Sequence, residues 1–523
     1  MFVILHPELI QLCYKITETV SRPLRFGLLE LQRLSAEQNE IVTIDPATDQ
    51  HAPADGAQPA AGGSAASFLT DLEDRTPAGI AAAMSRRIRS GAIQPGTRLP
   101  TVREVARELR VSPATVNQAW RALAATGAII ARGRAGTFVG EPVATRISRP
   151  EGRYQRLHPP SDSAFRLDLS RGTPDARLLP DPSAALRALA DAGTAGDLAS
   201  NYLGDAVLPE FAAKLRADWP FRPETIAVLD GALDAVDRLL TAHVRLGDAV
   251  AVEDPCFPPF LDLLSRIGAR PVPVRMDESG PLPADLAAAV TEYGVAALIL
   301  QPRAQNPTGA SLTARRVRDL AEILAPTGTL VIEDDHSTGI ASAPLRSIGA
   351  RLPGRTVHIR SYSKSHGADL RIAVAGGPAR LLDPVVERRM LGPGWTSRLL
   401  QRLLLTMLDD QDAVRAVEHA RAEYRRRSAE LRRALARRGV QAPRADGINL
   451  WLPVAEENAA MISLAAAGIK VAPGGPFEVR DHPGSDHLRI TVSPLGDHDF
   501  EWLATELAAA TKALPTYRRI RRV

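Results

Sequence analysis

The chain contains very little cysteine and no long apolar run. Its 523 residues include only Cys13 and Cys256 as cysteines, which excludes a disulfide framework and fits a reducing compartment. No stretch reaches the roughly 18 consecutive apolar residues of a membrane span. Residues 1–12 are interrupted by Pro7 and Glu8 and lack the flanks of a signal peptide. We therefore expect a cytoplasmic protein that does not enter a membrane, without internal repeats or a metal site.

The charge of the chain is unevenly distributed. The net charge is +4, but residues 76–140 hold ten arginines against Glu104 and Glu108, a net +8 that leaves −4 for the rest. A small basic segment on a mildly acidic body is typical of nucleic-acid-binding proteins. An arginine-rich solvated face gives the same sum, so charge alone leaves both interpretations open.

Composition and length predict several domains. Residues 1–68 read as an N-terminal extension and linker, expected to be partly disordered because their second half is small, polar and proline-bearing. Residues 76–140 form a small structured domain, residues 141–164 a second linker, and residues 165–510 a large body.

The small domain carries the pattern of a winged helix-turn-helix. Apolar residues at helical spacing predict a first helix from Pro77, and Thr101 can cap a second. Ser112 at the N-cap and Pro113 at the first helical position begin a third helix, which extends to about Ala125. Two short strands are expected at residues 128–132 and 136–139.

The third helix is the candidate recognition helix, because such a helix enters the major groove and presents its N-terminal residues to the bases. A basic residue at the start of the preceding helix can reach a phosphate, and the wing can approach the minor groove. The candidate DNA-binding residues are Arg103, Ser112, Ala114, Thr115, Asn117, Arg132, Arg134, Gly136 and Thr137. A winged helix used for protein contact is the alternative.

This segment closely resembles the GntR family of winged-helix repressors. The resemblance rests on Gly91-Ala-Ile-Gln-Pro-Gly96, Leu99-Pro-Thr-Val-Arg103, Val111-Ser112 and Gly136-Thr-Phe-Val139. It implies binding to double-stranded DNA. The family usually places a basic residue after the Val-Ser pair, and Pro113 stands there instead, so one phosphate contact is missing.

The body alternates strand-like apolar runs with amphipathic helices. Such runs lie at residues 249–252, 295–300, 329–332 and 356–359. This alternation predicts an α/β domain with a largely parallel sheet, followed by a smaller α+β lobe.

The body also carries the parts of a pyridoxal 5′-phosphate site. Lysine forms a Schiff base with an aldehyde when its surroundings lower its pKa, and we predict that Lys364 has this role. The cofactor also needs an acid at its ring nitrogen, a donor at its phenolic oxygen and an aromatic neighbour. Asp334, Asn306 and Phe257 are the respective candidates. Each is weak alone, and their order along the chain carries the prediction.

The remaining cofactor candidates bind phosphate, and one further residue binds the effector. Backbone N–H groups at a helix start suit a phosphate. The predicted phosphate-binding residues are Gly231, Ala232, Leu233, Ser361, Ser363 and Arg371. Arg489 is placed to hold an effector carboxylate through two hydrogen bonds.

This order of residues resembles fold type I, the aspartate aminotransferase family, over roughly residues 165–510. With the winged helix in front, the whole chain resembles the MocR subfamily of GntR regulators. The resemblance implies a fold type I aminotransferase-like body that binds pyridoxal phosphate and an amino-acid-like effector. It also implies a head-to-tail homodimer in which Tyr202 reaches the phosphate of the partner subunit.

Two positions depart from the subfamily pattern. His336 follows Glu333-Asp334-Asp335 where a tyrosine is usual, and we expect it to contact the phenolic oxygen in a pH-dependent way. Asp369 replaces an expected glycine, and an acid there is unfavourable unless it points away or pairs with Arg371. Both changes favour a sensor over a catalyst. The leading hypothesis is a transcriptional regulator that senses its effector through the Schiff base at Lys364. The alternatives are an active aminotransferase and a regulator that has lost the cofactor.

Overall fold

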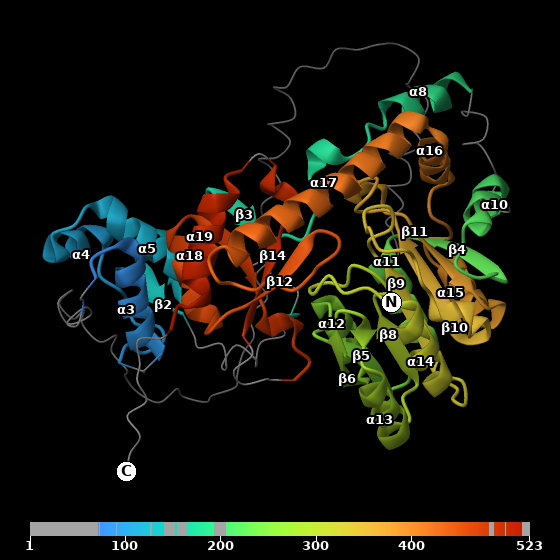
Figure 1. Cartoon of the computed structure of the whole chain (residues 1–523), viewed down its shortest axis with the longest axis horizontal. Coiled ribbons are helices and arrows are strands. Elements are labelled where there is room, and N and C mark those ends of the chain that lie inside the picture. The colour runs from blue at the N-terminus through green and yellow to red at the C-terminus, as the bar shows by residue number, and fades with distance from the viewer. Residues whose placement is uncertain are drawn as a thin grey trace, which may run out of the picture. The chain divides into compact units, whose positions relative to one another are not determined.

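The computed structural model describes residues 72, 74–89, 92–125, 128–140, 152–153, 165–192, 205–480, 486–496 and 498–514. The predicted N-terminal extension therefore lies outside the described residues, and so does most of the predicted linker. Figure 1 shows the described helices and strands along the chain.

The small N-terminal domain is a winged helix-turn-helix. Its helices are α3 (Pro77–Arg89), α4 (Val102–Leu109) and α5 (Pro113–Ala125), and its wing strands are β1 (Ile129–Ala131) and β2 (Thr137–Val139). The two strands pair antiparallel around the short 3-10 helix η1 (Gly133–Ala135). The predicted three helices and two strands are confirmed to within a residue or two.

Local hydrogen bonds explain where two of these helices begin. The Thr101 hydroxyl accepts the Glu104 N–H at 3.3 Å, and the Glu104 carboxylate accepts the Thr101 N–H at 2.7 Å. This reciprocal capping box satisfies backbone donors that the first turn leaves unpaired. The Ser112 hydroxyl accepts the Thr115 N–H at 3.1 Å and caps α5 in the same way. Both predicted caps are confirmed.

The large domain is an α/β layer structure. Its eight-stranded sheet has the order β4-β11-β10-β9-β8-β5-β6-β7. Six strands are mutually parallel, while β11 and the short β7 are antiparallel to their neighbours. The bounds are β4 (Thr225–Leu229), β5 (Ala249–Asp254), β6 (Arg270–Asp277), β7 (Gly280–Pro281), β8 (Ala297–Leu300), β9 (Leu330–Asp335), β10 (Thr356–Ser361) and β11 (Ala373–Gly377).

Helices cover both faces of this sheet, which explains why its central strands are apolar along most of their length. One apolar cluster joins the sheet to α11 (Ala232–His243), α12 (Pro258–Ile267) and α15 (Ala379–Met390). A second joins the other face to α13 (Pro283–Tyr293) and α14 (Ala314–Leu324). Further helices are α8 (Ser183–Asp191), α10 (Pro209–Ala217) and α16 (Arg398–Asp409). The predicted, largely parallel α/β sheet is confirmed.

The C-terminal lobe is a four-stranded sheet with the order β12-β14-β13-β3 and three packed helices. Its elements are β12 (Asn449–Pro453), β13 (Ile469–Pro473), β14 (His487–Thr491), α17 (Gln411–Ala436), α18 (Glu457–Ala466) and α19 (Phe500–Thr511). The fourth strand, β3 (Leu167–Leu169), comes from the start of the body and pairs parallel with β13. The sequence pattern predicted the lobe but did not show that this early segment belongs to it.

In the part of the chain that the structure describes, no helix combines the length and apolar character that crossing a membrane requires.

Candidate functional site

The predicted cofactor residues gather at one edge of the large sheet. Strands β5, β8, β9 and β10 are parallel neighbours, so their carboxyl ends lie at the same edge. Asp334 is close to the end of β9, Ser361 ends β10, and Lys364 follows three residues later. The chain turns there, out of the sheet, and this places side chains from distant segments near one another.

Asp334 is a buried carboxylate with one oxygen that has no partner. Its Oδ2 accepts the Gln301 side-chain N–H at 2.8 Å, whereas its Oδ1 is buried without a hydrogen bond. Burial raises the pKa of the Asp334 carboxyl to about 6, and the nearby Lys364 ammonium opposes that rise. A buried charged oxygen without a donor is costly, and a protonated ring nitrogen is a suitable donor for it.

Lys364 lies in a setting that makes its neutral amine easier to form than it is in water. Burial lowers the pKa of Lys364 to about 8, the Asp334 carboxylate opposes that change, and the Arg489 charge adds to it. The Lys364 ammonium contacts Nδ1 of His336. A depressed pKa is what a Schiff-base lysine requires.

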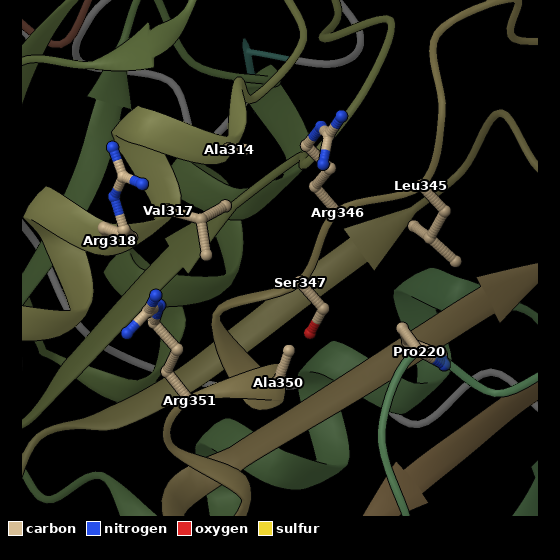
Figure 2. A pocket seen from close by; sticks show the side chains of 9 residues that line it. All are labelled: Pro220, Ala314, Val317, Arg318, Leu345, Arg346, Ser347, Ala350 and Arg351. Carbon is tan, nitrogen blue, oxygen red and sulfur yellow. The ribbon is translucent and has the colours of Figure 1, made fainter.

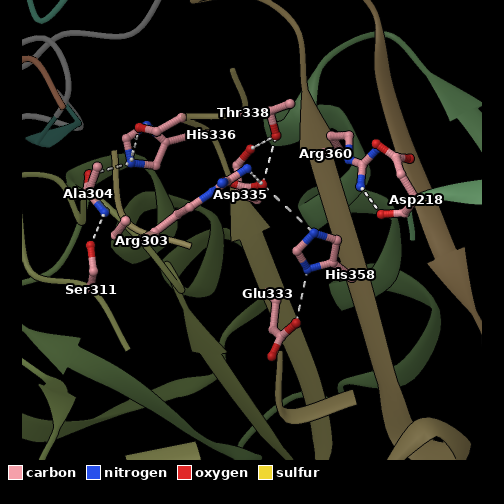
Figure 3. A network of polar contacts seen from close by, with 12 residues as sticks. Asp218, Arg303, Ala304, Ser311, Glu333, Asp335, His336, Thr338, His358 and Arg360 are labelled. Carbon is pink, nitrogen blue, oxygen red and sulfur yellow. Dashed lines mark hydrogen bonds and ion pairs between the residues drawn. The ribbon is translucent and has the colours of Figure 1, made fainter. Parts of the chain in front are cut away.

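The contacts of His336 determine which of its ring nitrogens carries the proton. Nε2 lies 3.0 Å from the carbonyl oxygen of Ala304, which can only accept, so Nε2 is the donor (Figure 3). Nδ1 is then an acceptor that faces Lys364 and the Ser337 hydroxyl, the latter at 3.2 Å. Burial lowers the pKa of His336 well below its usual range. At neutral pH His336 is therefore a neutral acceptor toward Lys364, and its expected pH-dependent contact with the phenolic oxygen stays a prediction.

Asn306 and Arg489 lie beside one another in the buried part of the site. The Asn306 side-chain oxygen accepts from the Asn449 amide at 3.3 Å and lies 3.5 Å from an Arg489 nitrogen. Since that oxygen faces these two donors, the Asn306 amide group is the part left for an acceptor. Arg489 also donates to the Ser170 carbonyl. It is held in β14, whose register with β12 places it opposite Trp451.

Among the predicted phosphate residues, Gly231 and Arg371 meet at the start of α11, whereas Ser361 and Ser363 lie at and after the end of β10. Gly231 has φ +106° and is the N-cap of α11, and a Cβ there would lie 2.7 Å from an Arg371 guanidinium nitrogen. Arg371 therefore approaches the backbone closely, and it donates to the Asp230 carbonyl at 2.7 Å. Ser361 is buried, and its hydroxyl lies 3.4 Å from the Ser363 N–H. Ala232 and Leu233 are the first two residues of α11, which begins slightly earlier than the sequence suggested.

Three further positions named from the sequence are Phe257, Asp369 and Tyr202, and the structure describes the first two. Phe257 is the N-cap of α12 and packs edge-on against Phe260, with ring centroids 5.3 Å apart. Asp369 is exposed in a short 3-10 helix, and the Arg371 guanidinium turns to a backbone carbonyl. Tyr202 lies outside the described residues.

A buried polar network lies on the strands that carry the site (Figure 3). His358 in β10 contacts the Glu333 carboxylate at 2.9 Å and lies 3.9 Å from Asp335. Arg303 pairs with Asp335 through two hydrogen bonds of 2.7 and 2.9 Å. Burial favours the protonated form of Asp335, but the Arg303 charge prevails and lowers its pKa to about 2. Successive side chains of a strand point to opposite faces, so Asp335 belongs to this network, whereas Asp334 faces Gln301 on the other side.

Sequence reasoning missed two members of the site. Gln301 follows β8 directly and connects Asp334 to the Asn306 backbone, whose N–H it accepts at 2.8 Å. Glu253 near the end of β5 accepts the Gln301 N–H at 3.1 Å, and burial raises the pKa of Glu253 to about 8. A polar residue at the end of an apolar strand was the available signal for both.

The candidate DNA-binding residues that the structure describes are exposed or partly exposed on the winged helix. Arg103, Ser112, Ala114 and Asn117 are exposed, and Thr115 is partly exposed and lies 2.8 Å from the Ser112 hydroxyl. In the wing, Arg132 is exposed and stacks on Phe138 at 5.1 Å. Thr137 is partly exposed, and Gly136 has φ +108°. The side chain of Arg134 lies outside the described part of the structure.

Arg98 is a wing contact that the sequence did not reveal. Its guanidinium packs against Gly136, where an added Cβ would lie 2.9 Å from Nε. The Leu99 N–H donates to the Thr137 carbonyl at 2.8 Å, which fastens the segment before α4 to the wing.

Fold and site together define a winged-helix DNA-binding domain joined to an aminotransferase-like body. Residues 76–139 match the bacterial regulatory proteins of the gntR family, and residues 166–505 match aminotransferase class I and II. The chain is 36% identical to the vitamin B6 salvage pathway transcriptional repressor PtsJ of Salmonella typhimurium over 84% of this chain and 99% of that protein. It is 28% identical to the HTH-type transcriptional regulator TauR of Rhodobacter capsulatus over 78% and 91% of the two chains.

Solved structures show the same fold for the body. LysN, an alpha-aminoadipate aminotransferase from Thermus thermophilus, matches with a TM-score of 0.60 and 22% identity over 70% of this chain and 96% of that one. Aspartate aminotransferase from Thermus thermophilus matches with a TM-score of 0.58 and 23% identity over 66% and 92%. The chain belongs to the MocR subfamily of GntR transcriptional regulators.

Proposed function

We propose that the body of this regulator binds pyridoxal 5′-phosphate and senses an amino-acid-like effector at Lys364. The observation that carries the proposal is the buried Asp334 Oδ1, which has no hydrogen-bond partner and lies beside a lysine whose pKa is lowered. The same chain carries a winged helix-turn-helix, so binding of a ligand at Lys364 could change the binding of DNA.

The residues present fit this cofactor. Asp334 Oδ1 would accept from the ring nitrogen, and the Asn306 amide would donate to the phenolic oxygen. Gly231, Ser361, Ser363 and Arg371 would hold the phosphate, together with the backbone of Ala232 and Leu233 at the start of α11. When bound, the cofactor supplies an aldehyde that bonds covalently to primary amines.

His336 and Lys364 set the proton balance in this proposal. His336 Nδ1 accepts a hydrogen bond from the Lys364 ammonium, and burial keeps the imidazole neutral. The lysine therefore keeps its own proton until its pKa of about 8 is approached. A tyrosine hydroxyl could donate at this position, whereas His336 has already committed its N–H to Ala304. This arrangement favours reversible exchange of the Lys364 amine with an effector amine on the cofactor, rather than catalytic transamination.

Arg489 would select the effector. It is buried and fixed against Ser170 and Asn306, so a carboxylate would reach a pre-organised guanidinium without solvent competition. An amine bonded at the cofactor and a carboxylate at Arg489 describe an amino acid. A ligand that binds one state of the body better shifts the population of states, and through the linker this would reposition the winged helices of a head-to-tail homodimer.

A second candidate is that pyridoxal phosphate is itself the signal. PtsJ, which shares 36% identity with this chain, is named as a repressor of vitamin B6 salvage. On this hypothesis cofactor loading alone changes DNA affinity, and no amino acid is needed.

The test combines absorbance with DNA binding. Full-length protein should bind pyridoxal phosphate and turn yellow, and Lys364→Ala should abolish the colour. The matched control is Lys214→Ala, because Lys214 is exposed and paired with Asp409. A gel-shift assay on the region upstream of the gene then compares protein alone, with cofactor, and with cofactor plus each amino acid.

Each outcome separates the hypotheses. A DNA response that needs both cofactor and an amino acid supports effector sensing, and a response to cofactor alone supports the second candidate. A colourless protein that takes up no cofactor overturns both. Steady conversion of an amino acid and a keto acid would instead identify an aminotransferase.

The DNA-binding residues have their own test. Replacing Arg103, Thr115 and Asn117 together with alanine should abolish sequence-specific binding. Arg103 lies at the start of α4, Thr115 and Asn117 lie near the start of α5, and all three are at least partly exposed. Retained specific binding would refute the assignment of α5 as the recognition helix.

A further inference from the structure

A cavity that is separate from the Lys364 site lies between α14 and the segment that joins β9 to β10. Its volume is about 290 Å³, and its lining residues are Pro220, Ala314, Val317, Arg318, Leu345, Arg346, Ser347, Ala350 and Arg351. Figure 2 shows Arg318 and Arg351 near Val317, with Arg346 above Ser347 and with Pro220 and Leu345 on the opposite side. None of the predicted cofactor residues belongs to this lining.

The cavity is strongly positive. Three of its nine lining residues are arginines and none is acidic. The neighbouring arginines of α14 have carboxylate partners: Arg315 lies 3.7 Å from Asp319, and Arg316 lies 2.8 Å from Asp277. Within the described residues, no such ion pair is formed by Arg318, Arg346 or Arg351. All three arginines are exposed on the cavity lining, so their guanidinium groups are open to an anion from solution.

The buried carboxylate of Glu333 does not neutralise these arginines. Ser347, which lines the cavity, donates to Glu333 at 2.6 Å, and the Ile348 N–H donates to the same carboxylate at 2.6 Å. His358 contacts it at 2.9 Å from the other side. Glu333 is fully buried and already holds three partners, so it does not serve as the counter-charge of these arginines.

We propose that this cavity binds a small phosphorylated metabolite. Guanidinium groups match phosphate oxygens through paired hydrogen bonds, and about 290 Å³ is close to the lower limit of small-molecule sites. Pro220, Val317 and Leu345 supply apolar surface for an organic portion beside the phosphate. A concave, partly apolar wall fits a small organic phosphate better than the convex backbone of a DNA duplex.

The test is isothermal titration of full-length protein with inorganic phosphate and with phenyl phosphate at constant ionic strength. The titrations use protein saturated with pyridoxal phosphate, so that the phosphate-binding residues of the Lys364 site are already occupied. They are repeated with Arg371→Ala, which weakens phosphate binding at that site. The Arg371→Ala arm remains informative even if the protein takes up no cofactor. Failure of this inference is therefore distinguishable from failure of the proposed function.

The variant is Arg318→Ala with Arg351→Ala, and the matched control is Arg315→Ala on the same helix. We expect phenyl phosphate to bind more tightly than inorganic phosphate, because only the ester reaches the apolar wall. The double variant should weaken its affinity by about a hundredfold, or about tenfold for each lost charge-assisted contact, while the control stays within about twofold.

Three results would overturn the inference. The first is absence of phenyl phosphate binding to the wild type. The second is equal loss of affinity in the control and the double variant. The third is unchanged phosphate affinity accompanied by weaker, less salt-dependent DNA binding in the double variant, which would assign these arginines to a DNA-binding surface. Thermal unfolding of all variants verifies folding.

Discussion

Replacing Asp334 with asparagine should stabilise the protein without cofactor and weaken cofactor binding. Burial raises the pKa of this carboxyl from 3.8 to about 6, which corresponds to about 3 kcal/mol of cost for the charged form. Asparagine removes the charge, and its side-chain oxygen can still accept the Gln301 N–H that Asp334 accepts at 2.8 Å. We therefore expect up to about 3 kcal/mol of added stability near neutral pH.

The pH dependence has a defined sign. Below pH 3.8 the carboxyl is protonated in the folded and the unfolded chain, so the variant and the wild type should be equally stable. Between pH 3.8 and about 6 the unfolded chain binds fewer protons than the folded one, and the wild type loses stability as the pH rises. The advantage of Asp334→Asn should appear across this interval and then remain constant.

Asp335→Asn is the matched control on the adjacent residue. The Arg303 ion pair holds the pKa of Asp335 at about 2 against burial, so its charge stabilises the folded state. The substitution should cost at least about 2 kcal/mol near neutral pH, and the loss should diminish as the pH falls through the range from 3.8 to about 2. The same replacement of aspartate by asparagine should therefore stabilise the folded protein at position 334 and destabilise it at position 335.

The assays are urea unfolding of cofactor-free protein across this pH range and titration with pyridoxal phosphate. A lost charge-assisted hydrogen bond should weaken the cofactor affinity of Asp334→Asn by about tenfold to a hundredfold. Destabilisation of the cofactor-free variant near neutral pH would refute the reasoning, because it would show that Asp334 is fully compensated. Unchanged cofactor affinity would refute its role at the ring nitrogen.

Three further predictions follow from single contacts. The rate at which Lys364 captures pyridoxal phosphate should rise about fivefold from about pH 7 to about pH 8 and at most about twofold further at higher pH, because the neutral amine reacts and its pKa is about 8; stopped-flow absorbance measures it. Gly231→Ala places a Cβ 2.7 Å from an Arg371 nitrogen at φ +106°; such strain costs about 1–3 kcal/mol, and equilibrium titration should show about tenfold or more weaker binding of the cofactor. Arg103→Ala should weaken binding about equally on all DNA sequences and reduce the salt dependence by about one counterion, as measured by fluorescence anisotropy at several salt concentrations.

Contrary results are equally specific for these three predictions. A capture rate that keeps rising to the ordinary pKa of lysine would show that Lys364 is solvated. Full cofactor affinity in Gly231→Ala would remove Arg371 from the phosphate site. A sequence-dependent loss in Arg103→Ala would make Arg103 a base-reading residue.

Much of the winged helix is predictable because its signals are local. The capping box of Thr101 and Glu104 and the Ser112 cap depend on residues three positions apart, and local spacing is readable from the chain. The packing of Arg98 on Gly136 in the wing was not predicted. Arg98 precedes α4 and Gly136 follows α5, so the contact joins residues that are far apart in the sequence.

The cofactor site shows the same division. The alternation of β9 places Asp334 and Asp335 on opposite faces, but only the packed sheet shows that Gln301 and Arg303 receive them. The tautomer of His336 was not predictable either, because its N–H is committed to a carbonyl from another loop. A protonation state depends on burial and partners, and neither is present in a motif.

The sequence by itself determined the two domain types, the capped helices, the strand pattern and the order of the candidate cofactor residues. These follow from periodicity, caps and short motifs, which act over a few residues. The tertiary structure decided that β3 pairs with β13 in the C-terminal lobe, that Asp334 has an oxygen without a partner, and that three arginines from two segments share a cavity. Those features arise from contacts between distant residues, whose burial and charge balance exist only once the chain has folded.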